Sequence, residues 1–138
     1  MCKQVLDEVM IMEIGLKHKK EITVTEKDTA LAYGSGSLEV FATPAMAALM
    51  ENTAMNCVAP YLGEGETTVG TLLDIKHLSA TPVGCTVSCE CELTEIDGRR
   101  LIFKVTASDN KALIGEGTHE RFIVQAEKFM SKTKTKLD

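Results

Sequence analysis

The spacing of hydrophobic and polar positions divides the chain into strand-like and helix-like segments. Polar and apolar residues alternate over residues 20–25, as they do in a half-buried strand. Residues 43–61 are apolar almost all the way around a helical cylinder, which is typical of a helix wrapped by other elements. Strand-like alternation then returns in four segments, at residues 67–79, 85–95, 100–108 and 114–126. An antiparallel sheet wrapped around one long helix would bury all these segments, so the sequence predicts an α+β fold.

The ends of the predicted elements carry recognisable cap and turn residues. Thr43 is expected to be the N-cap of the long helix, with Pro44 at the first helical position, where its missing N–H does no harm. The pair Asp97-Gly98 predicts a tight hairpin turn. Residues 33–37, Tyr-Gly-Ser-Gly-Ser, predict either a surface loop or a mobile cover over a site, and we favour the loop.

The length of the chain fits a single domain. Residues 1–138 are enough for one hydrophobic core and too few for several. Residues 1–15 alternate apolar and charged residues loosely, which predicts a short helix or an arm. Residues 131–138 are poor in apolar side chains and are expected to fray.

Composition and charge exclude several classes of function. Hydrophobic residues make up 44% and charged residues 25% of the chain, as in ordinary globular proteins, and the net charge of -5 argues against a nucleic-acid surface. No apolar stretch approaches the ~20 residues that span a bilayer, and acidic residues stand where a secretory signal would be basic and then apolar. The five cysteines are an odd number, which does not suit a disulfide framework. We therefore expect a cytoplasmic protein that binds neither membranes nor nucleic acid.

Glu51 is the most informative single residue, because it interrupts the apolar helix. A carboxylate among Met, Leu and Ala side chains costs desolvation energy unless a partner compensates it. One explanation is structural: the carboxylate reaches a basic partner or the end of the core. The other is chemical: the carboxylate is a base or nucleophile tuned by its surroundings.

Two other residues are candidates for the same chemistry. Strand alternation puts His77 on the face of Leu73 and Ile75, toward the helix, where it is either a functional group or an ordinary core histidine. Thr43 and Glu51 are eight residues apart, which on a helix means ~12 Å of rise and ~80° of rotation. Their side chains cannot touch. They either act from opposite ends of one substrate or belong to a site that combines two chains of a dimer.

No residue pattern points to a metal or to a phosphate-binding loop. Cys85, Cys89 and Cys91 share one strand face, but they lack Cys-x2-Cys spacing or a companion histidine, so we interpret them as buried apolar thiols. Cys57 has no positive group close in sequence that would activate it. The glycines of residues 34–36 lack the Lys-Ser/Thr ending of a phosphate loop. We expect no metal and no other cofactor.

Six local strings, together with their spacing between residues 38 and 128, connect the chain to a known family. They are Phe41-Ala42-Thr43, Leu49-Met50-Glu51, Ala59-Pro60-Tyr61-Leu62, Thr81-Pro82-Val83-Gly84, Gly98-Arg99-Arg100-Leu101 and Gly115-Glu116-Gly117-Thr118-His119-Glu120-Arg121. Together they resemble the hotdog-fold thioesterases, and most closely the fluoroacetyl-CoA thioesterase family. The resemblance implies a hotdog fold, in which an antiparallel sheet wraps around one long central helix.

The resemblance also implies a set of site residues and partners. In that family a threonine at the helix start, a glutamate eight residues on and a histidine on the following strand form the catalytic set. These positions fall on Thr43, Glu51 and His77. Gly70 matches a glycine near the acyl group, and Gly70 and Arg121 are both expected to bind substrate. Such enzymes hydrolyse acyl-CoA thioesters as homodimers with interfacial sites, so the expected partners are an acyl-CoA and a second copy of the chain.

One segment departs from the family pattern. The fluoroacetyl-specific enzyme has phenylalanines before the helix, which gate its acyl pocket, whereas this chain has Tyr33-Gly34-Ser35-Gly36-Ser37. We therefore expect hydrolysis of a small or medium acyl-CoA, without fluoroacetyl specificity. Glu51 is either the nucleophile, which gives an anhydride, or the base that activates water, and His77 assists proton transfer.

Two other functions stay open. One is a hotdog protein that binds acyl-CoA without turning it over. The other is an acyl-CoA hydratase of the same fold, which generally carries an Asp and a His five residues apart near the helix start. That pair does not occur in this sequence.

Overall fold

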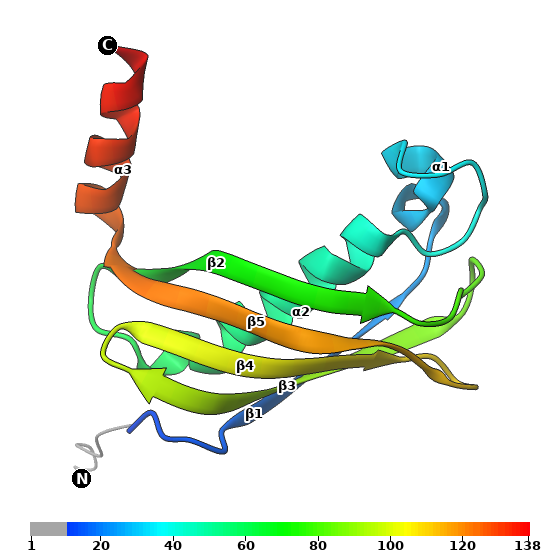
Figure 1. Cartoon of the computed structure of the whole chain (residues 1–138), viewed down its shortest axis with the longest axis horizontal. Coiled ribbons are helices and arrows are strands. Elements are labelled where there is room, and N and C mark those ends of the chain that lie inside the picture. The colour runs from blue at the N-terminus through cyan, green and yellow to red at the C-terminus, as the bar shows by residue number, and fades with distance from the viewer. Residues whose placement is uncertain (1–10) are drawn as a thin grey trace, which may run out of the picture.

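The computed structural model describes residues 11–138 and contains one five-stranded antiparallel sheet with a long helix across one face (Figure 1). The strands are β1 (Lys17–Thr23), β2 (Glu66–His77), β3 (Thr86–Asp97), β4 (Arg100–Ser108) and β5 (Leu113–Gln125). The helices are α1 (Ala30–Tyr33), α2 (Thr43–Val58) and α3 (Ala126–Lys134). The strand order is β1-β3-β4-β5-β2, so β1 and β2 are the edges of the sheet. The predicted α+β architecture is confirmed.

The strands form where alternation predicted them, with small shifts at their ends. The shifts arise because pairing with a neighbour, rather than composition, sets where a strand ends. β1 begins at Lys17 because that residue pairs with Glu92 of β3. The predicted hairpin turn at Asp97-Gly98 is confirmed, and Gly98 takes a left-handed φ of 61° there. β2 carries a bulge between Gly70 and Leu72, which sequence alternation did not predict.

The helix α2 forms in the long apolar run and continues as a 3-10 turn over Ala59–Tyr61. Its buried side chains, among them Met46 and Met50, join inward-facing side chains of the sheet such as Leu93 and Phe103 in one core. Burying a side chain of this size contributes ~1.5–3 kcal/mol, so contact between helix and sheet is what holds α2 in place.

The structure corrects two expectations about α2. The N-cap is Ala42, which offers no side-chain hydrogen bond, and Thr43 is the first helical residue. The Thr43 hydroxyl is hydrogen-bonded to His77 and so does not cap the helix. The helix is also not wrapped on every side: Thr43 and Ala48 are exposed and Glu51 is half-buried. Two residues of this uncovered stripe lie against β2, because Thr43 is hydrogen-bonded to His77 and Glu51 lies beside Gly70.

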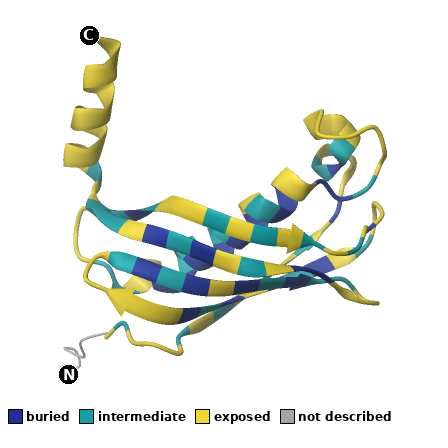
Figure 2. Cartoon of the chain, in the orientation of Figure 1, coloured by how far each residue is buried: buried dark blue, intermediate teal, exposed yellow. Residues whose placement is uncertain are grey.

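The C-terminus differs from expectation, and the N-terminus is described only in part. Residues 11–15 contain a turn and no helix, and the rest of the predicted arm, residues 1–10, lies outside the described residues. Residues 131–138 were expected to fray, but α3 extends through Lys134 and a 3-10 turn follows. Glu127 in the first turn and Lys132 in the last turn of α3 complement the helix dipole, which favours a helix without burial. Figures 1 and 2 show α3 standing away from the sheet with an almost wholly exposed surface.

No helix among residues 11–138 is long and apolar enough to cross a membrane.

Candidate active site

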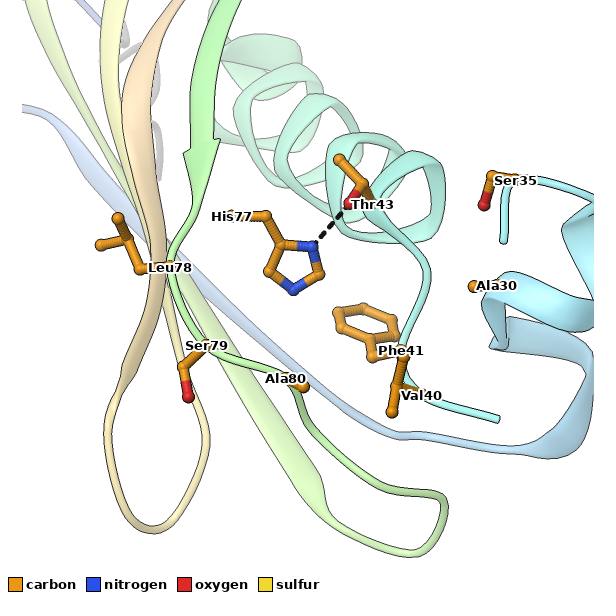
Figure 3. Close-up of a pocket in the computed structure, with 9 residues that line it drawn as sticks. All are labelled: Ala30, Ser35, Val40, Phe41, Thr43, His77, Leu78, Ser79 and Ala80. Carbon is orange, nitrogen blue, oxygen red and sulfur yellow. Dashed lines mark hydrogen bonds between the residues drawn. The ribbon is translucent and has the colours of Figure 1, made fainter. Parts of the chain in front are cut away.

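Thr43 and His77 meet at one end of the molecule, where α2 begins and β2 ends. The Thr43 Oγ1 and His77 Nδ1 atoms are 2.7 Å apart, which is hydrogen-bonding distance (Figure 3). The pair opens onto a pocket of about 330 Å³ whose lining mixes polar and apolar side chains: Ala30, Ser35, Val40, Phe41, Thr43, His77, Leu78, Ser79 and Ala80. The structure therefore brings two of the three predicted catalytic residues together beside a cavity.

The environment of His77 favours the neutral imidazole, and one ring nitrogen has no hydrogen-bond partner among the described residues. The Phe41 ring approaches His77 edge-on, with ring centroids 6.5 Å apart. Burial lowers the pKa of His77, because the charged imidazolium is poorly solvated there. Among the described residues no group is hydrogen-bonded to the buried Nε2 atom, which lies on the side of the ring away from Thr43 (Figure 3). Nε2 is thus available to exchange a proton with a bound molecule.

Glu51 lies in a second group of residues, built around Gly70. A Cβ atom placed on Gly70 would lie 3.0 Å from Glu51 Oε2, 3.2 Å from His119 Cε1 and 3.4 Å from Arg121 Nη1. Three functional groups therefore converge on the space that the missing side chain leaves open. We call this space, bounded by Glu51, Gly70, His119 and Arg121, the Gly70 slot. Gly70 itself is exposed, so the slot is open to solvent in a single chain.

Arg121 is nearly buried, with 6% of its surface exposed, and the protein holds its guanidinium firmly. Nε donates to the Thr68 hydroxyl at 2.8 Å, and Nη2 donates to the Thr68 carbonyl at 2.9 Å. Nη1 donates to His119 Nε2 at 3.1 Å. Burial lowers the pKa of Arg121 and the Glu51 carboxylate opposes that change. An arginine so placed supplies a fixed positive charge beside the Gly70 slot.

The two groups do not meet within one chain. His77 and Gly70 are both in β2 and seven residues apart, which corresponds to ~23 Å of extended strand. Thr43 is bonded to His77, while Glu51 lies against Gly70. Reacting groups must approach to within about 3–3.5 Å of one another, so a single chain holds two separated parts of a site.

The comparisons with known proteins identify the family. Residues 24–127 match the family of fluoroacetyl-CoA-specific thioesterases, FlK. The chain belongs to this family. A fluoroacetyl-CoA thioesterase from Streptantibioticus cattleyicolor is 46% identical over 98 residues, which cover 71% of this chain and 70% of that protein.

Solved structures agree with the FlK family assignment. The fluoroacetyl-CoA thioesterase FlK matches with a TM-score of 0.87 and 38% identity, covering 92% of this chain and 98% of that one. A thioesterase superfamily member from Thermus thermophilus has a TM-score of 0.83 at 26% identity, covering 89% of this chain and 91% of its own. The hotdog fold and the thioester hydrolase class expected from the sequence are confirmed.

His119 is the residue of this site that sequence reasoning missed. It was placed in the last strand without a role, yet it is fully buried and touches both Arg121 and β2. Its position two residues before Arg121 puts both side chains on one face of β5, and both lie in a string shared with the FlK family. Those two signals together could have identified it. Thr68 could not have been found, because its contact with Arg121 depends on the register of β2 against β5.

Residues 33–37 lie beside the pocket, and the cysteines described by the structure have free thiols. The segment favoured as a surface loop borders the pocket, because Ser35 is one of its lining residues. Gly34 ends α1 in a left-handed conformation with φ 74°, which turns the chain back toward the pocket. Cys89 and Cys91 are buried as predicted, and Cys85 is half-buried. Within residues 11–138 no group of three or more His, Cys, Asp or Glu residues could hold a metal.

We expect the free energy of unfolding to decrease as the pH falls below about 6.5, the usual pKa of histidine in an unfolded chain. Burial lowers the folded-state pKa of both His77 and His119. The unfolded chain therefore binds more protons at these two sites, and stability is lost on acidification until the folded-state pKa is passed. Each unit of pKa difference contributes up to about 1.4 kcal/mol. Urea unfolding between about pH 5 and 7.5 measures the effect.

The variant His119→Gln serves as the control for this prediction, because it removes one of the two titrating groups. Its stability should depend less steeply on pH than that of the unmodified chain. A free energy of unfolding that is constant or increases on acidification would contradict the prediction.

Proposed function

We propose that this chain is an acyl-CoA thioesterase that hydrolyses a small or medium acyl-CoA to the free acid and CoA, at sites formed between two copies. The observation that carries the proposal is the Thr43–His77 hydrogen bond at a pocket lined by both polar and apolar side chains. Thr43 and His77 are two of the three residues that the resemblance to the FlK family makes catalytic. The third residue, Glu51, lies at the Gly70 slot.

The two-chain site is supported by the free edge of β2. Among the described residues β2 pairs only with β5, so one row of its backbone N–H and C=O groups has no partner. Leu72 and Leu78, at and just after the bare edge strand, are 43% and 49% exposed. If the β2 strands of two chains paired in antiparallel fashion, the His77 end of one β2 would lie beside the Gly70 end of the other. A homodimer joined this way would bring Thr43 and His77 of one chain toward Glu51 of its partner.

The chemistry follows from the groups that such a site would combine. Glu51 either attacks the thioester carbonyl carbon, so that CoA thiolate leaves and an acyl–glutamyl anhydride forms, or removes a proton from an attacking water. In the first route, water then cleaves the anhydride and neutral His77 accepts its proton at Nε2. Thr43 orients the His77 ring. Backbone N–H groups at the start of α2 have no side-chain cap and are suited to stabilise the oxyanion.

The size and lining of the pocket support a small or medium acyl group. Ala30, Val40 and Ala80 contribute short side chains to a cavity of about 330 Å³, at the lower end of the usual range for small-molecule sites. Arg121 and Gly70 are proposed to contact the substrate from the chain that supplies Glu51, where the guanidinium and the slot lie together. The described cysteines carry free thiols, which suits a reducing compartment, and we propose a cytoplasmic location for this single-domain enzyme.

An assay of free-thiol release over short, branched, aromatic and long acyl-CoAs tests the proposal. We expect turnover of short or medium substrates, with kcat/KM falling as the acyl chain outgrows the pocket. Binding of acyl-CoA with no thiol release across the whole panel would instead establish a non-catalytic binding protein. A preference for long chains would contradict the proposed acyl size.

A further inference from the structure

His119 has hydrogen-bond partners that fix its chemical form. Its Nδ1 atom lies 2.8 Å from the carbonyl oxygen of Leu72, which can only accept a hydrogen bond, so Nδ1 carries the proton. Its Nε2 atom lies 3.1 Å from Arg121 Nη1, which can only donate, so Nε2 is the acceptor. The Phe103 ring stacks on the imidazole, with centroids 6.2 Å apart. His119 is therefore a neutral imidazole in one tautomer and one orientation.

The charges around His119 agree with this form. Burial lowers the pKa of His119, and the Arg121 cation acts in the same direction. The Leu72 carbonyl and the carboxylates of Glu51 and Glu120 act in the opposite direction. Protonation at Nε2 would also place an N–H against the donors of Arg121. The imidazole thus accepts a hydrogen bond from the arginine only while it is neutral.

His119 holds Arg121 by a hydrogen bond at a position close to Glu51. Both charged groups face the Gly70 slot, and their opposite charges attract each other. No ion pair joins them among the described residues, because Thr68 and His119 hold the guanidinium. If Arg121 were released, it could close onto the carboxylate. A direct ion pair would occupy the slot and engage the oxygen atoms that the reaction needs.

We propose that His119 is a positioning residue of the thioesterase reaction: it tethers Arg121 beside Glu51 and keeps the two charges from closing into a direct ion pair over Gly70. The inference rests on the proposed function of Glu51. It assigns His119 no contact with the substrate, since the ring acts through Arg121. The positive charge remains near the reacting carboxylate while the slot stays open to the thioester.

The variant His119→Leu tests the tether by kinetics. We expect kcat to fall about 10- to 100-fold with little change in KM, the usual size of effect when a group that orients a functional residue is removed. His119→Gln, whose side-chain oxygen can accept the hydrogen bond from Arg121, should stay within about threefold of the unmodified chain. Val105→Ala is the packing control, because Val105 is buried on β4 opposite Gly117 and away from Arg121. A His119→Leu enzyme as active as the unmodified one would overturn the proposal.

A double-mutant cycle with Arg121→Met tests whether His119 acts through Arg121. The double variant His119→Leu/Arg121→Met should be no slower than Arg121→Met alone, because no guanidinium remains to be tethered. If the loss of kcat in the double variant equalled the product of the losses in the two single variants, the proposal would be overturned. Should His119→Leu fail to fold, Thr68→Val removes another acceptor of Arg121 with little change in shape, and should lower kcat in the same way.

A crystal structure of His119→Leu gives a readout that does not depend on turnover. We expect a guanidinium nitrogen of Arg121 within about 4 Å of a Glu51 oxygen, the distance of an ion pair. An Arg121 that remains on Thr68, away from Glu51, would overturn the tether whatever the substrate is. If the unmodified chain hydrolyses no acyl-CoA, the proposed function fails, while this structural result still decides the role of His119.

Discussion

Replacing Glu51 with glutamine is expected to lower kcat for acyl-CoA hydrolysis by roughly 10³-fold, within the range for removal of a general base or nucleophile. The amide keeps the shape of the side chain but can neither attack a carbonyl nor accept a proton from water. Glu51 is half-buried and has no direct ion pair among the described residues, so the folded structure should change little. KM should stay within a fewfold, because the loss concerns the transition state. Thiol release measured against substrate concentration separates the two constants.

The matched control is Glu116→Gln, which makes the same chemical change on an exposed position of β5. This variant should keep the activity of the unmodified enzyme. A Glu51→Gln enzyme that retains more than about a tenth of the activity would remove Glu51 from the centre of the mechanism. Single turnover in ¹⁸O-labelled water then distinguishes the two routes. Label can enter the Glu51 carboxylate only if an anhydride forms and water attacks its glutamyl carbon.

The elements of the fold could be predicted because their hydrophobic periods are clear. The apolar run that became α2 and the alternation that became β4 depend on local sequence, and both were found with correct starts. The prediction that Thr43 is the N-cap of α2 was wrong, and the local sequence could not have shown why. The hydroxyl has a competing partner, His77, which is 34 residues away in the chain. The bulge at Gly70 and Leu72 likewise depends on how β2 lies against β5.

The roles of the candidate site residues stay predictions, and the sequence indicated only part of how these residues are grouped. Helix geometry alone showed that Thr43 and Glu51 could not touch, and the structure gives them separate partners. Their partners in β2 are also far apart, because Gly70 and His77 are separated by ~23 Å along the strand. What the sequence could not reveal is the cluster around Arg121. It forms from β2 and β5, whose pairing register is a property of the folded sheet.

The separation within one chain leads to the second large effect, restoration of activity by mixing two inactive variants. Glu51→Gln and His77→Ala should each be nearly inactive as purified homodimers. After equal amounts are unfolded together and refolded, about half of the dimers contain one chain of each kind. In such a dimer one interfacial site carries both substitutions. The other combines Glu51 and His77 from the chains that retain them, so about a quarter of the original activity should return.

Restoration to this level requires that Glu51 and His77 of one site come from different chains. If each chain held a complete site of its own, every site in the mixture would lack one residue and activity would stay at the level of the parents. The control is a mixture of Glu51→Gln with Glu51→Gln/His77→Ala, in which no site has an intact glutamate. Its activity should remain at the baseline. When the two variants are mixed without unfolding, activity should return only as fast as the subunits exchange.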